Sequence, residues 1–278
     1  MRKVISGLSR LPHDAIMSLV TTFDGVSLKK IALPVEHGGW GIVLEPAVLG
    51  LAVVPAAAGI PIALAALLAF LARQPLKLSL NDLRKGKVYP RTRPAIFFAL
   101  AYGVGATVML AAAIALSGWN LLVPFALALP FGLIQLFHDA RNDSRQWVAE
   151  TAGSVAMGSV ASSIAIAGGA GAALAFTLWL LMLCRSIPAV MYVRARLRLE
   201  RGGRPATAAV LAVHVLALAA SAVLHPLAAL AMVVLLARAA IGLSSWRKSA
   251  RPHRIGYAEI GYGILTVVLI ALGYTVLR

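Results

Sequence analysis

Residues 119–150 read WNLLVPFALALPFGLIQLFHDARNDSRQWVAE, in which an uncharged apolar run passes directly into a charged stretch. The run, 119–137, is long enough for one helix to cross the hydrocarbon core of a membrane. The stretch that follows holds three carboxylates, those of Asp139, Asp143 and Glu150. The sequence therefore predicts a membrane helix that ends in a polar segment, and that segment is the first candidate for a functional site.

Apolar runs of this kind recur along the whole chain. Hydrophobic residues make up 60% of the 278 residues and charged residues 13%, and the mean hydropathy is +0.85, values typical of an integral membrane protein. The pattern predicts an all-α polytopic bundle of nine transmembrane helices. The expected spans are residues 38–55, 61–71, 95–116, 119–137, 149–167, 172–193, 206–224, 226–243 and 255–277. Residues 34–278 thus form one transmembrane domain, and residues 1–33 form an N-terminal arm expected at the cytoplasmic membrane surface.

The basic residues predict the orientation of the spans. The chain has 26 Lys and Arg residues and a net charge of +16, and these residues gather in the arm and in every second loop, whereas the intervening loops hold none. Short cytoplasmic loops of membrane proteins carry such an excess, so the N-terminus is expected inside and the C-terminus outside. No motif for binding DNA or RNA accompanies the charge. This favours membrane lipids and anionic substrates as partners, and no nucleic acid.

The charged stretch after residue 137 is a candidate metal site. At helical spacing Asp139, Asp143 and Glu150 fall at i, i+4 and i+11, and so share one helix face. Mg²⁺ takes oxygen ligands from one or two carboxylates and completes its shell with water and a substrate phosphate. The alternative is a solvated loop whose carboxylates are neutralised by Arg141 and Arg145.

The loop NDLRKGKVYPRTRP, residues 81–94, is the basic counterpart of that stretch. Lys85, Arg91 and Arg93 precede a helix expected after Pro94, and a helix N-terminus surrounded by cations favours a bound anion. A plain cytoplasmic loop would also be basic. The loop is therefore either an anion site or a topological signal.

A third group of candidates lies inside the spans, where ionisable side chains are costly and tend to face a cavity or a partner. Glu45 lies in the first span, and Arg185 and Tyr192 share one stripe of the sixth. Arg185 needs a carboxylate or a phosphate as its partner. The candidate carboxylate partners are those of Glu45, Glu150 and Glu259. A purely structural ion pair is the alternative, and His214 and Arg238 are weaker candidates, expected to bond to backbone and to reach the membrane surface, respectively.

Five motifs carry a family resemblance: LPVEHGGWGIVLEP, NDLRKGKVYPRTRP, HDARNDSRQWVAETAGSVAMG, RSIPAVMYVRARLRLERG and RPHRIGYAEIGYG. Together they resemble the YwiC-like family of bacterial integral membrane proteins, over about residues 34–278. The resemblance implies a multi-pass protein of the bacterial cytoplasmic (inner) membrane. It does not assign a reaction.

A more distant similarity links the chain to the UbiA superfamily of intramembrane prenyltransferases. In that superfamily the loops after the second and fourth spans carry Asp-rich motifs that hold Mg²⁺ and an isoprenoid diphosphate. Asn81 and Asp82 match the start of the first motif, and Asp139 and Asp143 match the DxxxD of the second. The first motif departs from the superfamily because basic residues replace its further aspartates. These residues are Arg84, Lys85 and Lys87.

These resemblances imply a protein that binds an isoprenoid or lipid phosphate and, as an enzyme, would transfer the prenyl group to an acceptor. Asp82, Asp139 and Asp143 would hold Mg²⁺, and Glu45 or Glu150 would orient the acceptor. The residues expected to bind the substrate are Asn81, Lys85, Arg91, Arg93, Arg185 and Tyr192. The alternatives are a transporter or lipid handler and a non-catalytic partner of a membrane complex, and the sequence leaves the oligomeric state open.

Overall fold

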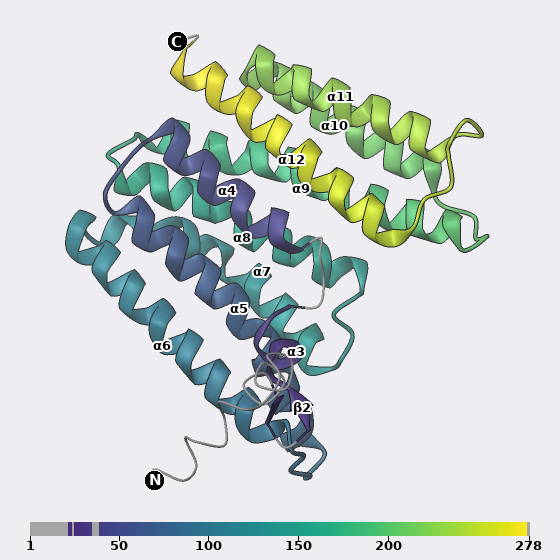
Figure 1. Cartoon of the computed structure of the whole chain (residues 1–278). Helices are drawn as coiled ribbons and strands as arrows, with labels where there is room; N and C mark the ends of the chain where they lie inside the picture. Colours follow the sequence, from purple (N-terminus) through teal and green to yellow (C-terminus); the bar gives the residue numbers. More distant parts are fainter. Residues whose placement is uncertain (1–21, 24, 35–38, 277–278) are drawn as a thin grey trace, which may run out of the picture.

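The computed structural model describes residues 22–23, 25–34 and 39–276. Within that part of the chain the protein is almost entirely helical (Figure 1), with nine helices of 15 residues or more. They are α4 (Gly39–Val53), α5 (Gly59–Arg84), α6 (Thr92–Ser117), α7 (Leu122–Ala140), α8 (Trp147–Ala167), α9 (Ala172–Glu200), α10 (Thr207–Leu224), α11 (Pro226–Leu243) and α12 (Pro252–Thr275), with a 3-10 turn, η1 (Trp119–Leu121), before α7. The predicted all-α bundle is confirmed.

The predicted N-terminal arm lies largely outside the described residues. Its described part forms a short antiparallel hairpin of β1 (Thr22–Phe23) and β2 (Val26–Ser27), followed by helix α3 (Leu28–Ala32). Ile31 and Ala32 are buried, and α3 packs against α5 and α6. The end of the arm is therefore joined to the helical bundle.

Seven of the helices in the described chain are long and apolar enough to cross a membrane: α5, α6, α7 with η1, α9, α10, α11 and α12. The other two are α4, which has 15 residues, and α8, which carries several serines. Helix α8 lies in the middle of the bundle against α4, α7 and α9 (Figure 1), and most of its side chains are buried. A helix surrounded by other helices meets little lipid and tolerates small polar residues. The multi-pass membrane fold is thus confirmed, whereas nine crossings and the orientation of the termini stay predictions.

The charged stretch after α7 departs from the predicted helical face. Helix α7 ends at Ala140, and Asn142 has a φ of 63°, in the left-handed region that Asn adopts more readily than most other residues. The chain therefore turns, and α8 starts only at Trp147. The prediction that Asp139, Asp143 and Glu150 share one helix face was wrong, because the turn separates them.

The connections between helices segregate by charge to the two ends of the bundle (Figure 1). The basic connections are residues 85–91, 141–146, 201–206 and 244–251, and those without Lys or Arg are residues 54–58, 118, 168–171 and 225. A buried cluster that includes Leu49 and Val53 of α4, Ala165 of α8, Leu178 of α9 and Ile270 of α12 fills the end without basic residues. The bundle is closed by apolar packing at that end.

Candidate binding cavity

A cavity of about 1510 Å³ lies toward the basic end of the bundle. Its walls come from the start of α4, the C-terminal part of α5, the first half of α8, the second half of α9 and the start of α12, with smaller contributions from α6, α7 and α10. In the first five helices, the contributing part is the one at the basic end. The cavity therefore lies opposite the apolar cluster that closes the bundle.

Most of the cavity wall is apolar. Examples are Ile42 of α4, Ala69 and Leu76 of α5, Met157 of α8 and Val190 of α9. Such a surface is unfavourable in contact with water and favours an apolar occupant. The body of the cavity is thus suited to a hydrocarbon chain.

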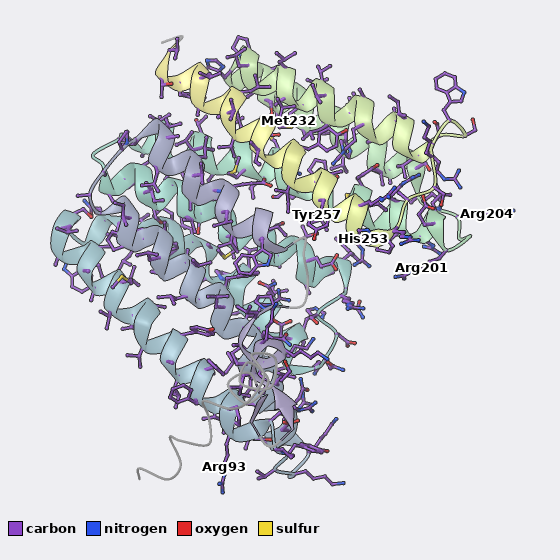
Figure 2. The ribbon with its side chains drawn as sticks, in the orientation of Figure 1. Arg93, Arg201, Arg204, Met232, His253 and Tyr257 are labelled. Atoms are coloured by element: carbon purple, nitrogen blue, oxygen red, sulfur yellow. The ribbon has the colours of Figure 1, made fainter. Side chains whose placement is uncertain are left out.

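Arginines gather at the end of α9, where the cavity wall reaches the basic connections. Arg194, Arg198 and Arg201 lie at i, i+4 and i+7 and line the cavity together with His253 of α12, and Figure 2 shows Arg201 and His253 at this end of the molecule. Arg194 donates to a carboxylate oxygen of Glu150 over 2.7 Å. Arg198 and Arg201 are exposed and, among the described residues, have no ion-pair partner. Both guanidinium groups are available to an anion.

The inner wall of the cavity carries a charged group formed by Glu45, Arg185 and Glu259. Arg185 is 3% exposed, and its Nη2 donates to Glu45 Oε1 over 3.3 Å and to the backbone carbonyl of Glu259 over 2.9 Å. Its Nη1 lies 3.6 Å from Glu259 Oε2. Two of the carboxylates predicted as partners of Arg185, those of Glu45 and Glu259, thus contact it.

A second arginine lies behind this group, away from the cavity wall. Arg238 donates from Nη1 to Glu259 Oε2 over 2.6 Å, and its Nη2 lies 3.2 Å from His214 Nε2. Its guanidinium carbon lies 4.1 Å from the ring centroid of Tyr192 and 5.2 Å from that of Tyr262. Tyr192 therefore forms a cation–π contact with Arg238. The predicted substrate-binding residue Tyr192 does not line the cavity.

In the segment predicted as the basic loop 81–94, Asp82 belongs to the end of α5 and pairs with Arg91 of the connection that follows. Its carboxylate is fully buried and accepts from Arg91 Nη2 over 2.8 Å, from Arg91 Nε over 3.1 Å and from Thr92 Oγ1 over 2.9 Å. The hydrogen bond to Asp82 raises the pKa of the Arg91 guanidinium above its usual value. This bidentate pair fixes the start of α6 against the end of α5.

The other residues predicted in that loop lie apart from the cavity. Asn81 donates from its side-chain amide to the backbone carbonyl of Lys77 over 2.9 Å. Lys85 and Arg93 are exposed, and Figure 2 shows Arg93 at the lower end of the molecule, far from Arg201 and His253. None of the residues predicted in this loop lines the cavity.

Asp139, near the end of α7, is also held by an arginine. Arg73 of α5 donates from Nε to Oδ2 over 2.6 Å and from Nη2 to Oδ1 over 3.0 Å, and Asp139 is 3% exposed. Arg73 also lines the cavity beside Gln135, whose side-chain oxygen accepts from both Arg73 Nη atoms in the orientation that satisfies the amide. Asp143 is exposed and borders a smaller pocket of about 700 Å³ next to the cavity.

These pairings bear on the predicted magnesium site. In the described part of the chain, no group of three or more His, Cys, Asp or Glu side chains comes together in a way that could hold a metal ion. Asp82 and Asp139 each direct both carboxylate oxygens toward a guanidinium group. Because both oxygens of each carboxylate already face a guanidinium group, Asp82 and Asp139 do not fit the ion. Of the three predicted ligands, only Asp143 is exposed, and a magnesium site stays a prediction.

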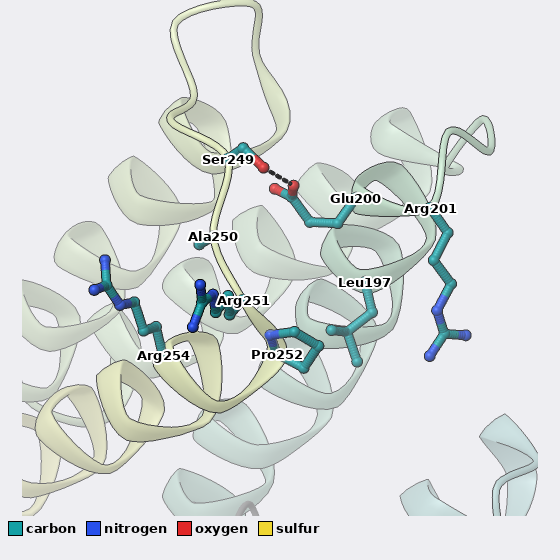
Figure 3. Close-up of a pocket in the computed structure, with 8 residues that line it drawn as sticks. All are labelled: Leu197, Glu200, Arg201, Ser249, Ala250, Arg251, Pro252 and Arg254. Carbon is teal, nitrogen blue, oxygen red and sulfur yellow. Dashed lines mark hydrogen bonds between the residues drawn. The ribbon is translucent and has the colours of Figure 1, made fainter.

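A smaller basic pocket adjoins the end of α9. It has a volume of about 590 Å³ and lies between the last turn of α9 and the start of α12. Figure 3 shows Arg201, Arg251 and Arg254 around it, with Ser249 donating to Glu200 over 2.7 Å. Arg201 belongs to both this pocket and the large cavity, which extends the cationic surface past the cavity mouth.

Among the predicted site residues, the cavity wall includes Glu45, Glu150 and Arg185. The residues of the cavity wall that were not predicted from the sequence as site residues include Arg73, Arg194, Arg198, Arg201 and His253. One signal was available in the sequence. Arginines at positions 194, 198 and 201 follow helical spacing, but a basic loop at the membrane surface explains them equally well.

Comparison with known proteins finds a similarity to a protein family. Residues 33–165 match the family model described as YwiC-like protein. No curated protein and no solved structure matches the chain. The matched segment runs from the end of the N-terminal arm almost to the end of α8 and includes Glu45 and Glu150. It confirms the resemblance to YwiC-like proteins, whereas the similarity to the UbiA superfamily stays a prediction.

Proposed function

We propose that this YwiC-like membrane protein binds an amphipathic anion, an isoprenoid or lipid phosphate, inside the large cavity. The hydrocarbon chain would lie along the apolar wall, and the phosphate would sit at the arginines at the end of α9, on the cytoplasmic side of the inner membrane. The observation that carries the proposal is a single cavity whose wall is apolar in the body and cationic at one end.

The size of the cavity supports an extended lipidic ligand. Pockets for drug-sized molecules are typically about 300–1,000 Å³, and this cavity is larger, at about 1510 Å³. A small hydrophilic anion would leave most of the apolar wall exposed to water, which is unfavourable. A ligand with a hydrocarbon chain covers that wall.

The cationic end supports phosphate rather than another polar group. Arg198 and Arg201 present guanidinium groups, which bind phosphate oxygens through two parallel hydrogen bonds. Arg194 and Arg73 also line the cavity, but both already contact carboxylates. We therefore assign the phosphate contacts to Arg198 and Arg201, without a bridging metal ion.

Transfer of the prenyl group to an acceptor is a further step of the same proposal. Glu45 lies on the inner wall of the cavity, away from the arginine end. It is the better placed of the two predicted catalytic carboxylates, because its contact with Arg185 is 3.3 Å long, whereas Glu150 is held by Arg194 over 2.7 Å. A lipid handler would use the same cavity without breaking a bond. Release of inorganic phosphate or pyrophosphate from the ligand separates these two outcomes.

Binding to the purified protein in detergent tests the proposal. We expect saturable binding of farnesyl diphosphate or phosphatidic acid, measured by displacement of a fluorescent analogue, and the two ligands distinguish an isoprenoid from a glycerolipid. Binding should persist in EDTA. The variants Arg198→Gln and Arg201→Gln should each weaken binding by about tenfold, since a hydrogen bond to a charged group contributes roughly 1.5–3 kcal/mol.

The control is Arg204→Gln, which removes an exposed arginine from the same connection but outside the cavity wall. Its affinity should equal that of the unmodified protein. Absence of saturable binding for every ligand, or an equal loss in Arg204→Gln, would rule out the proposed site.

A further inference from the structure

Five ionisable side chains from five helices form one buried cluster beside the cavity. They are Glu45 of α4, Arg185 of α9, His214 of α10, Arg238 of α11 and Glu259 of α12. Each of these groups is costly to place inside a membrane protein. A buried ion pair is weak evidence for a role in stability, because an apolar cluster of the same volume is often equally stable. A cluster of this composition next to a cavity therefore calls for a functional explanation.

The cluster is balanced in charge when both glutamates are ionised. Arg185 and Arg238 supply two positive charges, and Glu45 and Glu259 supply two negative ones. His214 is neutral in this arrangement. Its Nδ1 lies 2.8 Å from the backbone carbonyl of Val210 and its Nε2 lies 3.2 Å from Arg238 Nη2; since the guanidinium can only donate, Nε2 accepts and Nδ1 carries the proton.

The two glutamates differ in the number of their contacts with arginine. Both carboxylate oxygens of Glu259 contact Arg238, and Arg185 Nη1 lies 3.6 Å away. Glu45 has one contact with a cation, the 3.3 Å hydrogen bond from Arg185. Hydrogen bonds to the charged form are what keep a buried carboxylate ionised. Glu45 is therefore the glutamate with fewer contacts to a guanidinium group.

The surroundings of Glu45 hold the carboxyl group in an apolar slot at the cavity. A Cβ atom on Gly41 would lie 2.7 Å from Glu45 Oε1, and a Cβ on Gly263 of α12 would collide with the same oxygen. The two glycines thus make room for the carboxyl group between α4 and α12. Glu45 is also part of the cavity wall, so water and a ligand can reach it.

Four helices pack against α4, namely α5, α8, α9 and α12, and each carries ionisable side chains. Helix α9 brings Arg185 and α12 brings Glu259. The ionisable residue of α8, Glu150, pairs with Arg194, and Arg73 of α5 pairs with Asp139. Arg238, His214, Tyr192 and Tyr262 lie on the far side of Glu259 and Arg185. The charge that responds directly to Glu45 is that of Arg185.

We propose that Glu45 is a proton-binding site whose protonation is coupled to the binding of an anion in the cavity. The Glu45 carboxylate takes a proton from water and becomes a neutral carboxylic acid. The cluster then changes from net neutral to a net charge of +1, because the charge of Arg185 is no longer balanced by Glu45. This added positive charge at the cavity wall favours an anion bound at the arginine end of the same cavity. The coupling rests on the proposed function, whereas the proton site itself does not.

Infrared difference spectroscopy of the ligand-free protein tests the proton site. On acidification, the unmodified protein should gain the C=O stretching band of a buried protonated carboxyl group. The band should be missing in Glu45→Gln and present in Glu150→Gln, the matched change of the other cavity glutamate. Glu45→Asp keeps a carboxyl group and should show the band at a shifted pH, which covers the case in which Glu45→Gln does not fold. A band unchanged in Glu45→Gln, or no band in the unmodified protein, would overturn the inference.

Anion binding as a function of pH tests the coupling. The probe is a long-chain alkyl sulfonate, whose charge does not change with pH. Above the pH at which Glu45 loses its proton, the affinity of the unmodified protein should fall as the pH rises, with a limiting slope of about tenfold per pH unit for uptake of one proton. Glu45→Gln should bind tightly at all pH values.

Two controls separate this effect from other charges at the cavity. Glu150→Gln removes a negative charge and should raise the affinity without changing the pH slope. His253→Gln removes the imidazole at the mouth and should keep the slope. A pH slope that survives in Glu45→Gln contradicts the coupling. A sulfonate that fails to bind at any pH contradicts the proposed function instead, and the infrared band still decides the proton site.

Discussion

Two kinds of arginine share the basic end of this bundle. Arg91 and Arg73 each form a bidentate pair with a buried aspartate, whereas Arg198 and Arg201 line the cavity with no carboxylate partner among the described residues. All four belong to basic segments that look alike in sequence. The difference shows that the role of a charge in a membrane protein is decided by its distant partner, which here lies on another helix or across a loop.

The paired arginines have a structural explanation. Asp82 is fully buried and Asp139 is 3% exposed, and a buried carboxylate is strongly unfavourable unless a cation and hydrogen bonds compensate for the lost water. Arg91 and Arg73 supply that compensation and join neighbouring helices as a result. The unpaired arginines remain hydrated at the surface, and an anion can displace that water.

The largest effect should come from breaking the ion pair between Asp82 and Arg91. Asp82→Asn leaves Arg91 without its counter-charge and removes a hydrogen-bonded carboxylate, so it should lower the free energy of unfolding by about 3 kcal/mol. Thermal unfolding in detergent measures this loss. The folded fraction should bind the anion with unchanged affinity. Lys85→Gln, an exposed change in the same loop, is the control and should alter neither quantity; loss of binding without loss of stability in Asp82→Asn would place Asp82 in the site instead.

Breaking the ion pair between Asp139 and Arg73 should lower stability less and, in contrast to Asp82→Asn, should change the affinity for the anion. Asp139→Asn removes the carboxylate that Arg73 contacts, and Arg73 is itself partly exposed, so the expected cost is about 2 kcal/mol. Because Arg73 lines the cavity, its charge is then less neutralised, and the affinity for the anion should rise several-fold. Weaker binding in Asp139→Asn would show that the aspartate itself takes part in binding.

The arrangement of the helices could be predicted from the sequence because it depends on local patterns. Apolar runs predicted the membrane helices, and basic residues in alternate loops predicted the segregation of charge to one end of the bundle (Figure 1). The end of α7 was missed because it depends on one residue, Asn142, in a left-handed conformation. Helical spacing across that turn suggested a shared face that the chain does not form.

The site was harder to predict, because its contacts join distant parts of the chain. Arg73 and Asp139 lie 66 positions apart, and Arg185 and Glu45 lie 140 apart. An Asp in a DxxxD motif has the same local signature whether it meets a metal ion or an arginine. The buried location of Glu45 and Arg185 was predictable from the cost of charge in a membrane; the pairing of Asp139 was not.

Arg185 combines features of both kinds of arginine: it is buried, but its contact with Glu45 is a single hydrogen bond of 3.3 Å. Gly263→Ala should sharpen this distinction, because the added methyl group displaces the Glu45 carboxyl group. Overpacking of this kind typically costs about 1–3 kcal/mol, and we expect the lower end because the carboxyl group can move into the cavity. The control is Gly261→Ala on the same helix, where a Cβ atom has no neighbour within 4 Å. Equal melting temperatures for the two variants would contradict the close contact between Glu45 and α12.

The smallest effect expected is that of salt on anion binding, and it separates the two kinds of arginine without any mutation. Screening shortens the Debye length from about 10 Å at 0.1 M to about 3 Å at 1 M salt, so contacts of the exposed Arg198 and Arg201 should weaken and the affinity should fall a few-fold. Farnesol, which has the hydrocarbon chain without the phosphate, is the matched ligand and should bind no more weakly at high salt. Salt screens the buried ion pairs of Asp82 and Asp139 only a little, so the melting temperature of the protein should not change over the same range of salt concentration. An anion affinity indifferent to salt would instead locate the phosphate deep in the cavity, at Arg185.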